Sequence, residues 1–208
     1  RTDPICPYFG VCGGCKWQFL SYEKQLAFKK NHVTESLEHI GLIKDVPVHD
    51  TLPSDPFFGY RNKMEFTCTD QRWLMPEELS NPDIVKGTGI GLHAPGTFSK
   101  VIDIKACHIW PSQGNLILED IRQFILDSGL EAYHLKNHTG FWRFIMMRHS
   151  VAHDEWMINV VTKDEDRETV GKLTERLVGK YPEITSVVNN VTSRKAGVST
   201  GEYEILLH

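Results

Sequence analysis

Residues 141–162 read FWRFIMMRHSVAHDEWMINVVT, and this stretch decides the fold class. Apolar and aromatic residues fill positions 141–150 and again 155–162, with the polar turn Ala152-His153-Asp154 between the two runs. Two such runs around a short polar turn are typical of a β-hairpin. We therefore predict two neighbouring antiparallel strands at this point of the chain.

Three segments with helical periodicity lie on either side of the hairpin. The first begins after Ser21 and ends at Gly41, the second covers about 112–128, and the third covers about 166–181 and ends at Pro182. In the first segment, the residues that recur at helical spacing are Tyr22, Leu26, Val33, Leu37 and Ile40.

Further strands are expected at 60–68, 89–94, 100–107, 184–191 and 203–207, with a polar excursion at 70–88. Hairpins interleaved with helices predict an α+β fold with a largely antiparallel sheet and about three helices. We expect two units, an irregular cysteine-rich loop at residues 1–20, packed at the sheet edge, and a central α+β domain at 21–208. The last predicted strand is cut short at His208, which suggests a fragment.

Length and composition exclude several classes of protein. The 208 residues are 40% hydrophobic and 24% charged, as in soluble globular proteins of one or two domains. No apolar run approaches the about 20 residues of a membrane helix, and the N-terminus does not resemble a signal peptide. We therefore expect a cytoplasmic protein with no membrane partner. Because the net charge is −4, any contact with nucleic acid has to come from local basic patches.

Three of the five cysteines form a motif. Cys6, Cys12 and Cys15 are spaced C-x5-C-x2-C, which is a poor disulfide framework but suits thiolate ligands of a metal centre. The fourth ligand is open among Cys68, Cys107 and a histidine. The spacing favours an iron–sulfur cluster only modestly over zinc, because zinc sites mostly use paired short knuckles.

The two remaining cysteines differ in context. Cys68 shares a strand face with Met64 and Phe66, which is typical of a buried core thiol. Cys107 lies where a strand meets a loop before Pro111, and a strand end can present a ligand.

Basic residues suggest where RNA could bind. Arg61 and Lys63 share a strand face and are our first candidates, although Glu65 on that face could pair with them. Arg143 and Arg148 lie in an acid-free stretch rich in aromatics, which suits phosphate contact and base stacking. Buried strands that exclude charge explain that stretch equally well, and the two arginines need a bulge to share a surface.

Several motifs together resemble the iron–sulfur and central region of the RNA uracil-5-methyltransferase family. They are Cys6-Pro-Tyr-Phe-Gly-Val-Cys-Gly-Gly-Cys15, Tyr60-Arg-Asn-Lys63 and Ile102-Asp-Ile-Lys-Ala-Cys107, in that order. Val187-Val-Asn-Asn190 resembles the segment that precedes the family's methyltransferase domain. The first motif is the most specific, and the resemblance extends over most of the chain.

The resemblance implies a SAM-dependent enzyme that methylates uridine C5 in RNA, with 23S rRNA favoured and tRNA possible. It also implies a [4Fe–4S] cluster held by Cys6, Cys12, Cys15 and Cys107. The family's SAM-binding catalytic domain has no counterpart in residues 1–208, so no catalytic or SAM-binding residue is assigned. We therefore expect an inactive fragment that carries the cluster and the RNA-binding region, with RNA and its own C-terminal methyltransferase domain as partners.

Two other functions stay open at this stage. One is a stand-alone RNA-binding module stabilised by zinc or by an iron–sulfur cluster. The other is a small iron–sulfur electron-transfer protein, although ferredoxin spacing does not place the fourth ligand in a distant strand.

Overall fold

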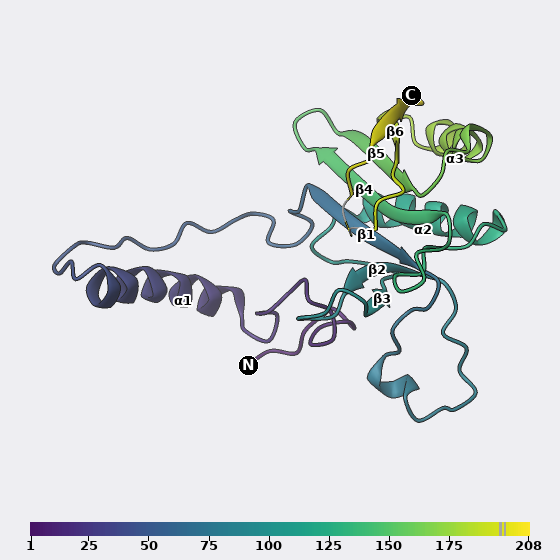
Figure 1. The fold of residues 1–208 in the computed structure, drawn as a ribbon. Helices are drawn as coiled ribbons and strands as arrows, with labels where there is room; N and C mark the ends of the chain where they lie inside the picture. The colour runs from purple at the N-terminus through teal and green to yellow at the C-terminus, as the bar shows by residue number, and fades with distance from the viewer. Residues whose placement is uncertain (196, 198) are drawn as a thin grey trace.

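The computed structural model describes residues 1–195, 197 and 199–208. Seven strands form one sheet in the order β3-β2-β1-β4-β5-β6-β7 (Figure 1). The strands are β1 (Lys63–Thr69), β2 (Gly89–His93), β3 (Val101–Asp103), β4 (Trp142–Ser150), β5 (Glu155–Thr162), β6 (Ile184–Val191) and β7 (Tyr203–Leu206).

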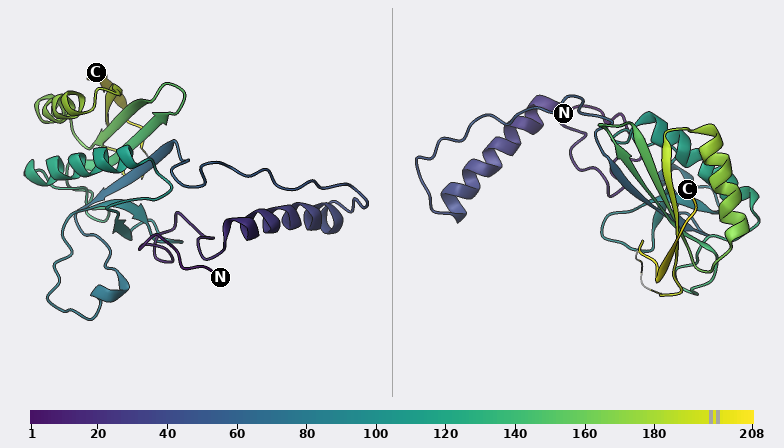
Figure 2. Two further views of the ribbon diagram at one scale, coloured as in Figure 1. Left: turned by 180° about the vertical axis from the view of Figure 1, so that it is seen from behind. Right: turned by 90° about the horizontal axis from the view of Figure 1, so that it is seen from above.

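The sheet is antiparallel at every pairing except one. β5 and β6 run parallel, and helix α3 (Arg167–Lys180) makes the crossover that a parallel pair requires. Helix α2 (Ser112–Asp127) lies beside α3, and both cover the same face of the sheet (Figure 2). The predicted α+β class and the largely antiparallel sheet are confirmed.

The hairpin at residues 141–162 is present and forms the centre of the sheet. β4 pairs with β5 from Ser150 opposite Glu155 to Trp142 opposite Thr162, with a register shift between Trp142 and Phe144. That shift is a β-bulge at Arg143, which turns this side chain away from the regular alternation.

The core fills the space between the sheet and the two helices. Met64, Phe66 and Cys68 alternate along β1 and are at most 2% exposed. They pack in one cluster with the inward residues of both helices. Cys68 is therefore the core thiol that its strand context predicts.

The first predicted helix forms, but it does not bury its apolar face. It comprises α1 (Tyr22–Glu35) and one π-helical turn (Ser36–Ile40), and none of its residues is buried. Val33 is 51% exposed and Ile40 is 83% exposed. The helix and the segment that follows it extend from the body of the protein as an arm (Figures 1 and 2). The predicted helix is therefore present, but its periodicity defines an apolar face without supplying a neighbour to cover it.

No helix of the described residues combines the length and the apolar character that crossing a bilayer requires.

Two glycines in helices give a direct test of the packing. A Cβ on Gly114, in the first turn of α2, would lie 2.0 Å from the indole nitrogen of buried Trp110. Gly114→Ala should therefore destabilise the protein by about 1–3 kcal/mol through overpacking. Gly171 in α3 has no atom within 4 Å of such a Cβ. Gly171→Ala should raise stability by up to about 1 kcal/mol, because alanine favours helix.

Chemical denaturation followed by circular dichroism measures both changes. Equal stability of Gly114→Ala and the wild type would contradict the packing of α2 against Trp110.

Candidate functional site

Three cysteines of the N-terminal loop meet Cys107 around one cavity. Cys6, Cys12, Cys15 and Cys107 all line a cavity of about 410 Å³, which we call the cysteine pocket. All are free thiols; the three loop cysteines are partly buried, and Cys107 is 9% exposed. Cys68 does not line this pocket.

Hydrogen bonds attach the cysteine loop to the edge of the sheet. The Gly13 N–H donates to the carbonyl of His93 at 3.0 Å, and the Lys105 N–H donates to the Tyr8 hydroxyl at 3.0 Å. A Cβ on Gly13 would lie only 3.0 Å from the His93 carbonyl oxygen, so a glycine permits this close approach. The loop is thereby held against the ends of β2 and β3.

The backbone of Cys107 is held by a side chain of α2. The Cys107 N–H donates to Oδ1 of Asn115 at 2.8 Å, and Nδ2 of Asn115 donates to the Cys107 carbonyl at 3.2 Å. This reciprocal pair satisfies both main-chain groups of Cys107 and orders the residue where it joins the pocket.

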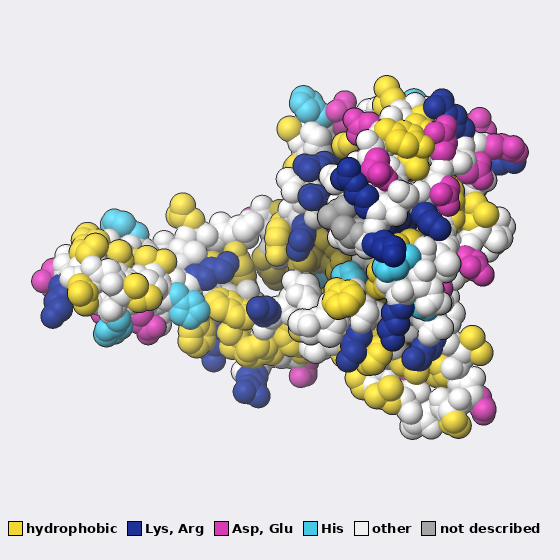
Figure 3. All heavy atoms as spheres, viewed as in Figure 1, with side chains coloured by type: hydrophobic (Ala, Val, Ile, Leu, Met, Phe, Trp, Pro, Cys, Tyr) yellow, Lys and Arg dark blue, Asp and Glu magenta, His cyan; other side chains and the backbone are white. Residues whose placement is uncertain are grey.

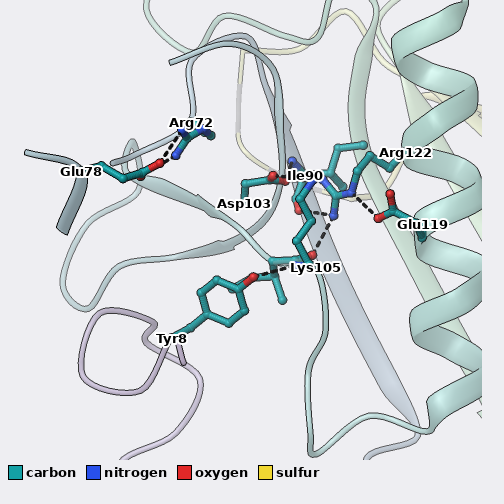
Figure 4. A network of polar contacts seen from close by, with 9 residues as sticks. Tyr8, Arg72, Glu78, Ile90, Asp103, Lys105, Glu119 and Arg122 are labelled. Atoms are coloured by element: carbon teal, nitrogen blue, oxygen red, sulfur yellow. Dashed lines mark hydrogen bonds and ion pairs between the residues drawn. The ribbon is translucent and has the colours of Figure 1, made fainter. Parts of the chain in front are cut away.

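A buried arginine holds the strand that leads to Cys107. Arg122 of α2 is 3% exposed and forms ion pairs with Asp103 and, at 2.9 Å, with Glu119. Its Nη2 donates to the carbonyls of Ile90 at 3.2 Å and Ile104 at 2.7 Å (Figure 4). A buried charge is tolerated only with such partners, so these contacts fix β2 and β3 relative to α2.

The thiols of the pocket influence one another electrostatically. Burial raises the pKa of Cys6 and of Cys12 above the usual value, and neighbouring thiols add to the increase. Burial, with contributions from Cys15, Cys6 and Cys12, raises the pKa of Cys107 to about 11. The pKa of Cys68 is raised to about 12, by burial. The thiols of Cys6, Cys12 and Cys107 are therefore protonated at neutral pH in this arrangement.

The donor chemistry of the pocket suits a thiophilic metal centre, since thiolates are ligands for zinc and for iron–sulfur clusters. The arrangement itself is not a formed metal site. Among residues 1–195, 197 and 199–208, no group of three or more His, Cys, Asp or Glu side chains is placed to hold a metal ion.

Three of the four predicted RNA contacts are exposed together on the sheet face opposite the helices. Lys63 lies directly across from Arg148 in the β1–β4 register, and Nε of Arg61 donates to the Lys63 carbonyl at 3.0 Å. We call Arg61, Lys63 and Arg148 the basic surface. Figure 3 shows Lys and Arg side chains gathered on this face. Glu65 lies 4.0 Å from the Lys63 ammonium and offsets part of its charge.

Arg143 lies inside the protein. It is 1% exposed, and its guanidinium donates to the carbonyls of Thr192 and Arg194, each at 2.7 Å. It also lies 4.4 Å from the ring centroid of Tyr133. The prediction that Arg143 contacts RNA is therefore wrong, because the main chain at Thr192 and Arg194 and the ring of Tyr133 enclose the guanidinium.

Sequence reasoning missed Asn115 and Arg122 altogether. Both lie on a helix whose pattern predicts only its apolar face, and their partners are main-chain atoms of other elements. No periodic signal marks such a contact. The only available clue was an arginine within an otherwise apolar helical stripe.

No family model matches the chain. An uncharacterized RNA methyltransferase of Chlorobaculum tepidum is 41% identical over 210 residues, covering 100% of this chain and 44% of that protein. A second uncharacterized RNA methyltransferase, from Porphyromonas gingivalis, is 34% identical and covers 100% of this chain and 46% of that protein.

The homologues of this chain are thus RNA methyltransferases. The chain spans a little under half the length of these relatives.

A solved structure shares the fold. It is the crystal structure of the Pyrococcus abyssi tRNA (uracil-54, C5)-methyltransferase in complex with S-adenosyl-L-homocysteine, with a TM-score of 0.62. The sequences are 24% identical, and the match covers 96% of this chain and 42% of that chain. At this identity the match establishes the fold alone.

These findings correct the function expected from the sequence. We expected a catalytically silent, cluster-bearing fragment of a 23S rRNA enzyme. Instead, the whole chain aligns with RNA methyltransferases, and its fold matches a methyltransferase that has bound S-adenosyl-L-homocysteine. The described residues hold no formed metal site. The description as an iron–sulfur module is therefore wrong. The two alternatives, a zinc-stabilised module and an electron-transfer protein, are not proposed further. Neither the preference for 23S rRNA nor the expected inactivity has support.

Proposed function

We propose that the protein takes part in SAM-dependent methylation of uridine C5 in RNA. The 41% identity to an RNA methyltransferase along the whole chain carries this proposal. The choice of uridine C5 and of SAM is supported by the fold shared with a tRNA (uracil-54, C5)-methyltransferase that has bound S-adenosyl-L-homocysteine. Residues 1–20 and 21–208 remain our proposed division of the chain.

The role proposed for the basic surface is to bind the phosphates of the substrate RNA. Arg61, Lys63 and Arg148 are exposed and lie close together, whereas the chain as a whole carries a net charge of −4. Local positive charge releases counterions from RNA and supplies affinity that falls with salt. Arg143 is not part of this proposal.

A methyl-transfer assay tests the proposed reaction. The part of the Chlorobaculum tepidum relative that aligns with this chain is replaced by residues 1–208, and the chimera is incubated with RNA transcripts and labelled SAM. We expect 5-methyluridine in nuclease digests analysed by mass spectrometry, with the unaltered relative as the control. An active relative that methylates any atom other than uridine C5 would contradict the proposed reaction.

RNA affinity tests the basic surface. Arg61→Ala and Lys63→Ala should each weaken binding of a labelled RNA stem-loop and lower the slope of log affinity against log salt by about 1. Fluorescence anisotropy at a series of KCl concentrations measures both effects. Lys172→Ala is the matched control, because Lys172 is exposed on α3 and pairs with Glu168. Equal slopes for all three variants and the wild type would remove the assignment.

The cysteine pocket carries a separate proposal. We propose Cys6, Cys12, Cys15 and Cys107 as thiol ligands of one metal centre. The support is their common cavity and the electrostatic coupling of their thiols. When bound, such a centre would link the N-terminal loop to the end of β3. Closing a loop of this length restricts the unfolded chain.

Metal analysis of protein purified under anaerobic conditions tests these ligands. We expect metal in the wild type, loss of metal in Cys12→Ser, and unchanged metal content in Cys68→Ala, because Cys68 lies outside the pocket. Iron with sulfide would indicate a cluster, and iron-free zinc would exclude it. Protein without either metal would contradict the ligand assignment.

A further inference from the structure

Hydrogen bonds and an ion pair close and hold the loop of residues 70–88 between β1 and β2. The Arg72 N–H donates to the Gly87 carbonyl at 2.9 Å and joins its two ends. The Arg72 guanidinium donates to both carboxylate oxygens of Glu78, each at 2.7 Å. Hydrogen bonds from the Arg72 guanidinium and the Met75 N–H lower the pKa of Glu78 to about 2. The Arg72–Glu78 ion pair therefore persists at neutral pH. The residue next to Arg72 is therefore held in place.

That residue is Trp73, which lies along the outer edge of β3. Its N–H donates to the Val101 carbonyl at 2.6 Å, and it forms a parallel bridge with Ile102. The indole packs partly against the core and is partly exposed. Within the described residues the indole N–H has no hydrogen-bond partner, and it is not among the buried unsatisfied groups. Trp73 thus presents part of a fixed aromatic surface to solvent.

Two lysines lie over the Trp73 ring. The Nζ atoms of Lys100 and Lys86 are 4.2 Å and 5.8 Å from the ring centroid. In the part of the chain that the structure describes, neither ammonium lies within 4.0 Å of a carboxylate. Such cation–π contacts hold a lysine near a ring without neutralising its charge. The two ammonium groups are therefore available to an anion beside the indole.

A polar cavity of about 690 Å³ adjoins this group, and Lys86 lines it. Its wall includes Asp70, Asn137 and His134, whose Nδ1 accepts hydrogen bonds from the N–H groups of Lys136 and Asn137 at 3.2 and 3.0 Å. The volume lies within the range of small-ligand pockets. Carboxylate and amide groups on the wall could pair with the edge of a base, while the lysines offer positive charge to phosphate.

We propose that Trp73, Lys86 and Lys100 form a subsite for an unpaired nucleotide of the RNA, with its base on the indole and its phosphate at the lysines. This inference rests on the proposed function and adds a second RNA contact to it. Three strand spacings, roughly 14 Å, separate residue 73 from β1, which carries Lys63. One phosphate cannot reach both places, so the RNA has to extend across the sheet from the basic surface to the edge of β3. Figure 3 shows Lys and Arg side chains on the viewed face beside this edge as well.

Affinity for a fluorescein-labelled oligouridylate tests the subsite in the full chain. Trp73→Leu should weaken binding about tenfold through loss of stacking, and Trp73→Phe should retain most of the affinity. Lys100→Gln should lower the salt slope by about 0.7, the value of one phosphate contact on a single strand. Leu79→Ala is the matched control, because Leu79 belongs to the same excursion and is 67% exposed.

An abasic oligonucleotide separates stacking from a structural role of Trp73. With abasic RNA, wild type and Trp73→Leu should bind equally. Thermal unfolding shows whether each variant folds, and if Trp73→Leu does not, Trp73→Phe and the surface change Lys100→Gln decide the matter. Wild-type affinity and salt slope in folded Lys100→Gln, or a Trp73 effect that persists with abasic RNA, would overturn the subsite. In that case weak binding by Arg61→Ala would leave the proposed function intact, whereas a wild type that binds no RNA would overturn both.

Discussion

The cysteine pocket and the position of Trp73 both depend on the contacts of the ion-paired Arg122 guanidinium. It joins α2 to Asp103 and to the carbonyl of Ile104, and so fixes the short strand β3. Cys107 follows this strand and completes the cysteine pocket, while Trp73 is hydrogen-bonded to its first residue. A three-residue edge strand has few ladder bonds of its own. Because loss of one partner would leave an uncompensated buried charge, the arrangement tolerates little displacement.

The layout of the sheet separates packing from recognition. One face carries the apolar side chains of β1 and is covered by α2 and α3. The opposite face carries Lys63 and Arg148 side by side, and Trp73 lies along the outer edge of β3 with Lys86 and Lys100 over its ring. A protein with a net charge of −4 therefore still presents two separate groups of positive side chains on its surface. The same alternation that buries Met64 and Phe66 exposes Lys63, so one strand serves both purposes.

Local patterns located nearly every element, but they could not say what covers each one. Strand alternation placed Cys68 in the core, and the hairpin predicted at residues 141–162 proved to be the centre of the sheet. The helix from Tyr22 shows the limit, because its periodicity is real and yet its apolar side is exposed. Arg143 shows another limit, since a residue that looks like a surface arginine is enclosed by main-chain carbonyls of the distant Thr192 and Arg194. Asn115 had no signal, because its partner is the backbone of another segment.

The sequence by itself determined the order and type of the elements, the α+β class and the spacing of the three loop cysteines. These depend on periods of two and 3.6 residues and on turn chemistry, all of which act over a few neighbours. Only the tertiary structure decided that Arg143 is buried, that α1 extends as an arm, and that Trp73, Lys86 and Lys100 meet. Burial and such meetings depend on partners far away in the chain, and these are brought together by the packing of the whole sheet.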